Sequence, residues 1–256
     1  MGPQMRGRSD RDWEELARED PYYSVLTAEK FRKKNLTGEA LDQFFHSGET
    51  YIDDLFAIIR AQLDPSFSPA SACDFGCGVG RLVVPLGRRC SRVVGIDVSE
   101  TMLSECRANL AKRAVDTCEL VKGDDRLSGL TGQFDLIHSF IVFQHIPVGR
   151  GLAIVQRLLE HTTPRGVVVL HFKYYPYRER SPLERTVLRV ASAVRDRLRV
   201  NARMQMNAYP LNELFSLLQR HEMNQCHVRF SQHGPGQDGV LIAAQRNPDI
   251  RHPGHF

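Results

Sequence analysis

The sequence lacks any apolar stretch long enough to cross a membrane. No run in its 256 residues approaches the roughly 18 consecutive apolar residues that a spanning helix needs. The N-terminal residues also lack the apolar core of a secretory signal. We therefore expect a cytoplasmic protein without a membrane span.

Clustered cysteines are also missing. The six cysteines stand apart from one another, and no Cys-x-x-Cys pair or Cys/His group with zinc-ligand spacing occurs. A metal site is therefore not expected. The cysteines are interpreted instead as buried thiols in a reducing compartment.

A large excess of one charge is absent as well. The net charge is +4, with 25% charged and 42% hydrophobic residues, which is ordinary for a soluble protein with a proper core. This balance permits an anionic substrate. It does not demand nucleic acid, which would require a basic face with interleaved aromatic residues.

What is present from about residue 71 is an alternation of short apolar runs and helical patterns, typical of βαβ units and a parallel sheet. Ser99 stands where it can cap the second helix. Near the C-terminus, two runs flank a Gly/Pro turn and indicate an antiparallel pair. We expect an α/β fold, with a Rossmann-like doubly wound, mostly parallel sheet and a C-terminal antiparallel hairpin strand. The expected strands cover residues 71–75, 92–96, 117–121, 134–140, 166–172, 225–231 and 239–245, and the helices residues 81–89, 99–111 and 149–161.

Two segments lie outside this wound core. A helical N-terminal extension or lid contains amphipathic stretches at 39–45 and 51–63. A connection of unusual length follows the fifth strand and is predicted to be a basic, helical insertion on the substrate side, with nine Lys or Arg against three acids. The expected divisions are a flexible N-terminus at 1–11, the extension at 12–65, the main domain at 66–246 with its insertion at 173–209, and a flexible tail at 247–256.

A glycine-rich loop follows the first strand. Its glycines, Gly76, Gly78 and Gly80, allow a tight turn and close approach of the backbone to a ligand. The dinucleotide pattern Gly-x-Gly-x-x-Gly is not met, because position 81 is Arg. Asp74, just before the loop, would also oppose a pyrophosphate at the following helix N-terminus. The loop therefore favours a ligand with an amino group over a dinucleotide.

Acidic residues follow the next two strands. Asp97 ends the second strand, 21 residues after Gly76, where a carboxylate can accept both hydroxyls of a ribose. The alternative is a helix-capping loop. Asp124 and Asp125 follow the third strand, and one of them could accept the amino hydrogen of an adenine. Their alternative is a solvated turn.

Together these features resemble the class I S-adenosylmethionine-dependent methyltransferases over residues 71–245. The resemblance implies S-adenosylmethionine as the cofactor, with Asp74 and the glycine backbone at its methionine moiety, Asp97 at the ribose and Met102 near the adenine. It does not specify the acceptor. The matching motifs are residues 73–81 (CDFGCGVGR), 94–103 (VGIDVSETML) and 134–140 (FDLIHSF).

Histidines offer candidate bases for a hydroxyl acceptor. His145 follows the fourth strand at the edge where ligands bind in such sheets, and His171 lies near the end of the fifth strand. Both are predicted catalytic residues, although each could instead pack in a loop or in the core. His138 is expected to be structural. His46 could belong to a lid and contact the substrate.

The basic insertion begins directly after the fifth strand. We hypothesise that Tyr174, Arg178 and their neighbours cap the pocket and bind an anionic or sugar-like acceptor. The alternative is a surface or dimerising helix with a solvated arginine face. Monomer and homodimer both stay open.

The sequence therefore predicts methylation of a small-molecule or glycan-type acceptor, at oxygen. Oxygen is favoured because of the two histidines and because no Asn/Asp-Pro-Pro-Tyr motif follows the fourth strand. The alternatives are an RNA or other N-methyltransferase, a catalytically silent methyltransferase-fold partner subunit, and an NAD-dependent oxidoreductase. The glycine spacing argues against the last of these, and nucleic acid is not the expected partner.

Overall fold

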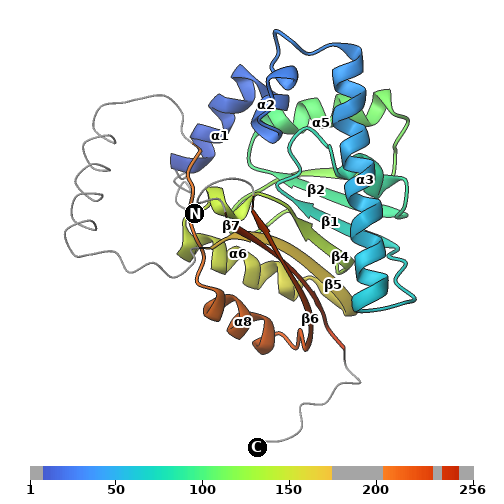
Figure 1. Cartoon of the computed structure of the whole chain (residues 1–256), viewed down its shortest axis with the longest axis vertical. Coiled ribbons are helices and arrows are strands. Elements are labelled where there is room, and N and C mark those ends of the chain that lie inside the picture. The colour runs from blue at the N-terminus through green and yellow to red at the C-terminus, as the bar shows by residue number, and fades with distance from the viewer. Residues whose placement is uncertain (1–7, 175–203, 233–237, 248–256) are drawn as a thin grey trace, which may run out of the picture.

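The computed structural model of the chain describes residues 8–174, 204–232 and 238–247 (Figure 1). Seven strands form one sheet in the order β3-β2-β1-β4-β5-β7-β6. The first five run parallel, and β7 lies antiparallel between β5 and β6. The predicted Rossmann-like sheet and its antiparallel C-terminal strands are confirmed. The strands are β1 Ser71–Phe75, β2 Arg92–Asp97, β3 Cys118–Lys122, β4 Phe134–Ser139, β5 Thr162–Lys173, β6 Gln225–Gln232 and β7 Asp238–Gln245.

The central strands are buried on both faces, because neighbouring residues of a strand point to opposite sides. Ala72 and Leu136 belong to one hydrophobic core, whereas their chain neighbours Cys73 and Ile137 belong to the other. The first core packs under the N-terminal helices together with α4 and α5, and the second under α6 and α8 (Figure 1). The helices are α1 Arg8–Glu19, α2 Pro21–Val25, α3 Gly38–Gln62, α4 Val83–Gly87, α5 Glu100–Lys112, α6 Val148–Glu160 and α8 Leu211–Arg220.

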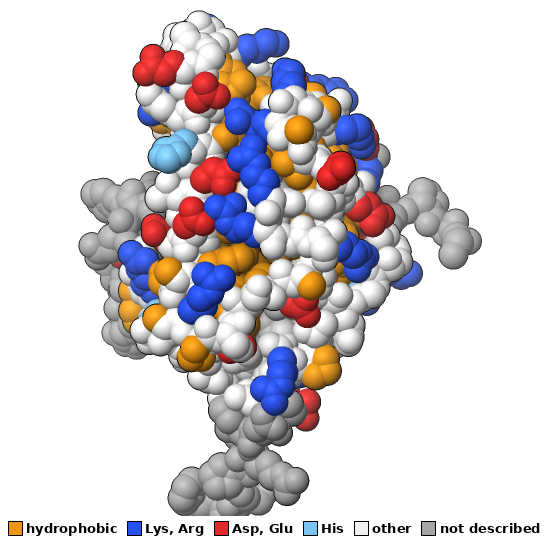
Figure 2. All heavy atoms as spheres, turned by 90° about the vertical axis from the view of Figure 1, so that its right-hand side faces the viewer, with side chains coloured by type: hydrophobic (Ala, Val, Ile, Leu, Met, Phe, Trp, Pro, Cys, Tyr) orange, Lys and Arg blue, Asp and Glu red, His pale blue; other side chains and the backbone are white. Residues whose placement is uncertain are grey.

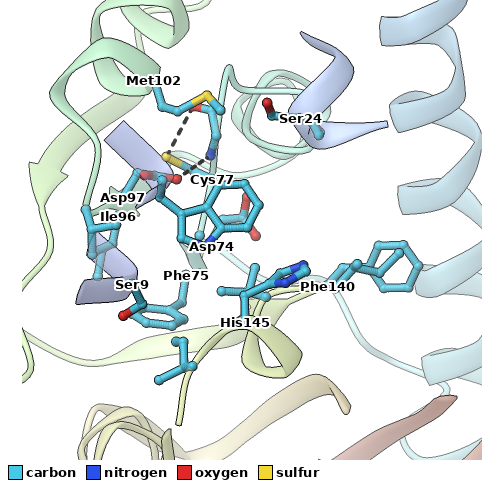
Figure 3. A pocket seen from close by; sticks show the side chains of 18 of the residues that line it. Ser9, Ser24, Asp74, Phe75, Cys77, Ile96, Asp97, Met102, Phe140 and His145 are labelled. Carbon is cyan, nitrogen blue, oxygen red and sulfur yellow. Dashed lines mark hydrogen bonds between the residues drawn. The ribbon is translucent and has the colours of Figure 1, made fainter. Parts of the chain in front are cut away.

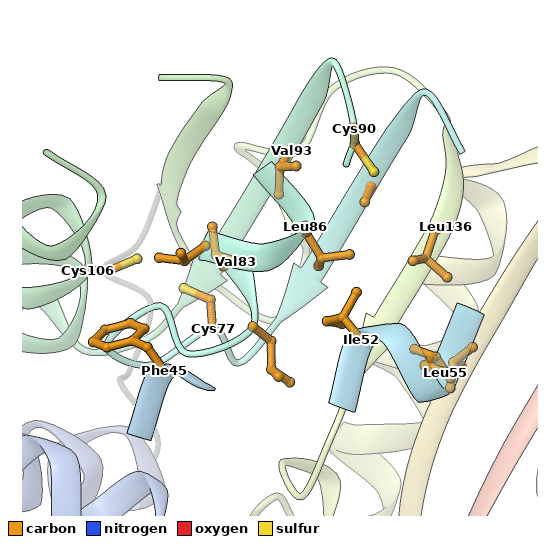
Figure 4. Packing of buried hydrophobic residues seen from close by; sticks show 14 of the residues in the cluster. Phe45, Ile52, Leu55, Cys77, Val83, Leu86, Cys90, Val93, Cys106 and Leu136 are labelled. Carbon is orange, nitrogen blue, oxygen red and sulfur yellow. The ribbon is translucent and has the colours of Figure 1, made fainter. Parts of the chain in front are cut away.

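The longest helix, α3, covers the first core. Its Phe45, Ile52 and Leu55 point toward α4 and the sheet (Figure 4). The sequence indicated two amphipathic stretches here, at 39–45 and 51–63, but the helix is continuous. Thr37 begins it as the N-cap, accepting a hydrogen bond from the Ala40 N–H at 3.2 Å.

Other element boundaries differ modestly from expectation. Helix α4 is shorter than the predicted 81–89, because the glycine loop continues as a turn through Leu82 before the helix starts. Strand β5 begins at Thr162 rather than at residue 166, through an irregular register against β4. Ser99 caps α5 as predicted, accepting from the Met102 N–H at 3.1 Å.

The cysteines are unpaired thiols. Cys73, Cys77, Cys90 and Cys106 are buried, which agrees with the prediction for these four, whereas Cys226 is exposed. No helix in the described part of the chain is long and apolar enough to cross a membrane. Most of the predicted basic insertion, including Arg178, lies outside the described residues.

Candidate active site

One pocket opens at the carboxyl ends of β1, β2 and β4 (Figure 3). Around it the structure brings together most of the residues that the sequence singled out for a cofactor. Helices α1 and α2 cover it from the other side with Trp13, Ser24 and neighbouring side chains. The predicted residues that line this pocket are Asp74, Gly76, Gly78, Asp97, Met102, Asp124 and His145.

The glycine loop is held against the end of β2. The N–H groups of Gly76 and Cys77 both donate to the Ile96 carbonyl, at 2.8 and 2.9 Å. Gly76 has φ +80, and a Cβ there would lie 2.3 Å from a methyl of Val142. Only glycine therefore fits this position, which brings the backbone of the loop to the pocket wall.

Asp97 joins the glycine loop to the start of α5. Its two carboxylate oxygens accept from the N–H groups of Gly78 and Ser99, each at 2.9 Å. Burial raises the pKa of Asp97 to about 6, against the opposing effect of these hydrogen bonds. The carboxylate is thus fixed at the pocket edge in one orientation.

Asp74 is the end of a buried polar chain. Its Oδ1 lies 2.7 Å from His138 Nδ1, and His138 Nε2 lies 3.0 Å from the Tyr51 hydroxyl of α3. His138, which was expected to be structural, is fully buried in β4. The sequence did not predict that it contacts Asp74, although adjacent residues of parallel strands make this contact natural.

The two acids after β3 lie differently. The Asp124 carboxylate lines the pocket while accepting from the N–H groups of Arg126 and Ser128, at 2.9 and 3.0 Å. Asp125 instead pairs with Arg150 of α6 and faces an adjoining groove between α1 and β3. Of the two, Asp124 is the acid placed to meet a ligand in the main pocket.

His145 forms part of the pocket wall in the short helix η2, Phe143–His145. Its Nδ1 lies 2.7 Å from the Gln205 carbonyl, and its Nε2 lies 3.2 Å from the Gln144 side-chain nitrogen. Trp13 packs edge-on against the ring, with centroids 4.9 Å apart. Burial lowers the pKa of His145, so the ring is neutral at neutral pH.

The remaining candidates lie outside the pocket lining. His171 is 2% exposed and packs against Phe140 within the sheet. His46 is exposed on α3, and Tyr174 packs against Phe230 at the end of β5. Gly80, with φ +90, turns the loop beside Cys106.

The predicted N-terminal extension or lid at 12–65 contains most of α1 but not the start of this helix. The helix begins at Arg8, inside the segment 1–11 that was expected to be flexible. Arg150 stabilises this first turn because its guanidinium donates to Ser9 Oγ and to both oxygens of Asp10, at 2.7–3.0 Å. A partner 140 residues away in the sequence gives no local signal.

Residues 72–166 match the methyltransferase domain family. The chloroplastic magnesium protoporphyrin IX methyltransferase of Arabidopsis thaliana is 30% identical over 115 residues, which are 44% of this chain and 36% of that protein. The magnesium protoporphyrin IX methyltransferase from Synechocystis PCC 6803, solved with SAH, superimposes with a TM-score of 0.64 at 18% identity, covering 94% of this chain and 100% of the other. The N-methyltransferase NodS from Bradyrhizobium japonicum gives 0.59 at 14% identity, covering 94% and 100%.

The chain has the fold of the class I S-adenosylmethionine-dependent methyltransferases, and its residues 72–166 match a methyltransferase domain. Structures with this fold have been solved with bound S-adenosylmethionine or S-adenosylhomocysteine, and the pocket of this chain suits the same chemistry. An acid stands at each of three neighbouring strand ends, with apolar Ile96 and Met102 between them. Such a set of acceptors fits an ammonium, ribose hydroxyls and the amino group of a purine. The methyltransferase spans only 36% of its Arabidopsis relative, so that protein's acceptor does not transfer to it.

Proposed function

We propose that this methyltransferase methylates a hydroxyl of a small-molecule or glycan-type acceptor, with His145 as the general base. The observation that carries the proposal is the hydrogen bond between His145 Nδ1 and the Gln205 carbonyl. A carbonyl only accepts, so Nδ1 carries the ring proton. Nε2 of the neutral ring is then its basic nitrogen, and it accepts from the Gln144 side-chain amide at 3.2 Å.

The cofactor roles are assigned to the acids of the pocket. Asp74 accepts from the ammonium of the methionine moiety, Asp97 from the ribose hydroxyls, and Asp124 from the adenine amino group. Met102 packs beside the purine. Asp125 is left out because Arg150 neutralises it. When bound, S-adenosylmethionine supplies a methyl group on a positively charged sulfur, which is open to direct displacement.

The protein contributes orientation and removal of one proton. His145 Nε2 would accept the proton of the acceptor hydroxyl, so that its oxygen could take the methyl group that the cofactor would supply. The acceptor hydroxyl would replace the Gln144 side-chain amide, which lies 3.2 Å from His145 Nε2. Trp13 and the Gln205 carbonyl keep the ring from turning away.

Support for a small acceptor comes from the relatives and from the pocket. Two of the similar proteins are named for magnesium protoporphyrin, a small molecule. Oxygen is preferred over nitrogen because a neutral histidine, His145, lies in the pocket wall and can act as a base. His171, the other candidate base, does not line the pocket. Tyr174 and Arg178 stay predictions for the acceptor end.

The test is transfer of a labelled methyl group to a panel of hydroxyl, amino and nucleic-acid acceptors. With the best hydroxyl acceptor, His145→Gln should lower kcat about 10²- to 10⁴-fold, the usual contribution of a general base. Binding of S-adenosylhomocysteine should change less than about threefold, because His145 is assigned to the acceptor hydroxyl and to none of the cofactor groups.

The matched control is His227→Gln, because His227 lies on β6 and does not line the pocket. Its kcat should equal that of the wild type. Because burial lowers the His145 pKa, kcat should rise with pH to a plateau whose midpoint lies below 6.5. Transfer confined to amines, with His145→Gln fully active, would refute the proposal.

A further inference from the structure

Arg81 is a buried cation at the end of the glycine loop. It lines the pocket and is only 7% exposed. Its Nε is buried and has no hydrogen-bond partner among the described residues. Its Nη1 has one long contact, 3.4 Å, to the Ser47 hydroxyl of α3. No carboxylate of the described residues lies within ion-pair distance of it.

The arginine is fixed by close packing of α3. A Cβ on Gly48 would lie 2.1 Å from the Arg81 carbonyl oxygen, so α3 touches the loop backbone itself. The guanidinium lies 5.8 Å from the centre of the Tyr51 ring. Burial lowers the pKa of Arg81, while the nearby Tyr51 and Asp74 oppose that shift. Burying the charged Arg81 guanidinium costs free energy of desolvation, which a bound anion would offset.

Asp74 lies close to this cation in the same pocket wall. His138 engages its Oδ1, and Tyr51 in turn engages His138. Tyr51 therefore adjoins both charged groups, the acid through His138 and the arginine through its ring face. The pocket wall therefore presents a negative group, the second oxygen of Asp74, near a positive group, the Arg81 guanidinium with its unused N–H donors.

We propose that Arg81 binds the α-carboxylate of the cofactor's methionine moiety, so that Asp74 and Arg81 together recognise an amino-acid zwitterion. His138 and Tyr51 are positioning residues that hold Asp74 in place. This inference rests on the proposed cofactor site and adds a group to it. An α-carboxylate is the anion expected beside the ammonium that Asp74 accepts, because both groups are borne on one carbon.

The experiment compares three ligands by calorimetry on the full chain. They are S-adenosylhomocysteine, its decarboxylated analogue and its deaminated analogue. Wild-type protein should bind the decarboxylated analogue about 10- to 100-fold more weakly, the range for lost charge-assisted hydrogen bonds. Equal affinity for these two ligands would overturn the proposal without any variant.

Substitution then assigns the effect to Arg81. In Arg81→Met the ratio between S-adenosylhomocysteine and its decarboxylated analogue should fall to below about threefold, since the partner of the carboxylate is gone. The penalty for the deaminated analogue should persist, because it reports on Asp74. Arg81→Lys should retain part of the carboxylate preference, which guards against loss of folding as the cause.

Arg88→Met is the matched control. Arg88 pairs with Glu49 on the outer side of α3 and does not line the pocket, so its three affinities should match the wild type. An Arg81→Met protein that still prefers the carboxylate would refute the inference and leave the methyltransferase site standing. Failure of wild-type protein to bind S-adenosylhomocysteine would refute both.

Discussion

Two opposing effects set the pKa of Asp97, which lines the pocket. Burial raises its pKa from an ordinary 3.8 to about 6, while the N–H groups of Gly78 and Ser99 favour the charged form. The charged carboxylate accepts ribose hydroxyls more strongly than the neutral acid does. Affinity for S-adenosylhomocysteine should therefore be constant above about pH 7 and weaken up to tenfold for each unit below about 6.

Titration calorimetry between pH 5 and 8 measures this dependence. Asp97→Asn removes the titrating group and keeps the shape, so its affinity should be lower, by roughly 1.5–3 kcal/mol, and nearly independent of pH. If the variant keeps the wild-type pH dependence, another group is responsible and the assignment of Asp97 to the ribose loses its support.

Ile141 has a backbone conformation that suits glycine. Its φ is +60, in the left-handed region, where a β-branched residue is strained, and it lies in the pocket wall after β4. Ile141→Gly and Ile141→Ala both remove the side chain. The Gly variant should have the higher free energy of unfolding, by about 1 kcal/mol, because only Ala keeps the strain.

Urea denaturation of the two variants measures that difference. At ordinary negative φ the order would be reversed, since Gly loses more backbone entropy on folding. An Ala variant more stable than the Gly variant would mean that position 141 does not hold a left-handed conformation in solution.

Single residues differ in how far the sequence predicts their roles. Asp97 and the loop glycines were predictable because their spacing along one βαβ unit is fixed. The contact between His138 and Asp74 depends on the register of β4 against β1, which no local pattern sets. Arg81 was noted only as a departure from the dinucleotide pattern, because its burial depends on the approach of α3 at Gly48.

At the level of elements, α1 covers the pocket and is held by charged contacts at its first turn and at its middle. Glu14 accepts from the hydroxyls of Ser99 and Thr101, each at 2.8 Å, at the first turn of α5. Burial would raise the pKa of Glu14, yet these hydrogen bonds lower it to about 2, so it stays charged there. In the first turn of α1, Asp10 forms an ion pair with Arg150. Between these anchors Trp13 lies over His145.

Loss of one anchor should loosen the lid. Arg150→Met removes the pairs to Asp10 and Asp125, so amide exchange in residues 8–19 should become about tenfold faster, a shift on the order of 1.4 kcal/mol. Bound S-adenosylhomocysteine should restore part of the protection, because α1 covers the pocket. Hydrogen exchange measured by mass spectrometry checks both effects.

Arg157→Met is the control for this change, since Arg157 lies two turns further along the same helix and is exposed. Its exchange in α1 should be unchanged. Unaltered exchange in Arg150→Met would instead mean that Glu14 and the apolar contacts of Trp13 and Ala17 suffice to hold α1.

The sequence predicted helices and strands well where their apolar residues followed a single repeat. The parallel strands, with alternating apolar residues bounded by turns, lay within a few residues of their predicted ends. The sequence predicts two stretches in α3 because residues 46–50 are polar or Gly, which interrupts the apolar pattern without breaking the helix. Helix α1 was only partly recognised, because its charged residues are stabilised by distant partners on α5 and α6.

For the molecule as a whole, charge distribution bears on the choice between a small acceptor and RNA. The net charge is +4, and nine of the 34 Lys and Arg fall in residues 173–209, against three acids. On the face that carries α3, positive and negative side chains are interspersed rather than segregated (Figure 2). Ion pairs such as Arg89–Glu49 and Arg89–Asp53 bring them together there. That face does not form the continuous basic surface that tracks a phosphate backbone.

Salt dependence therefore separates the two acceptor classes at this scale. A small acceptor meets at most a few charges of the protein, so kcat/KM should fall less than about threefold between 50 and 200 mM salt. An RNA acceptor neutralised by six to ten cations would lose roughly 10³–10⁵ in affinity over the same range. The measurement uses the full chain and the best acceptor from the methyl-transfer panel.

Replacing Arg178, Arg180 and Arg185 by Ala then tests the role of the basic segment. A steep salt dependence that these substitutions reduce would assign the segment to nucleic acid and exclude the small-acceptor proposal. A shallow slope with a raised KM would assign it to an anionic small molecule.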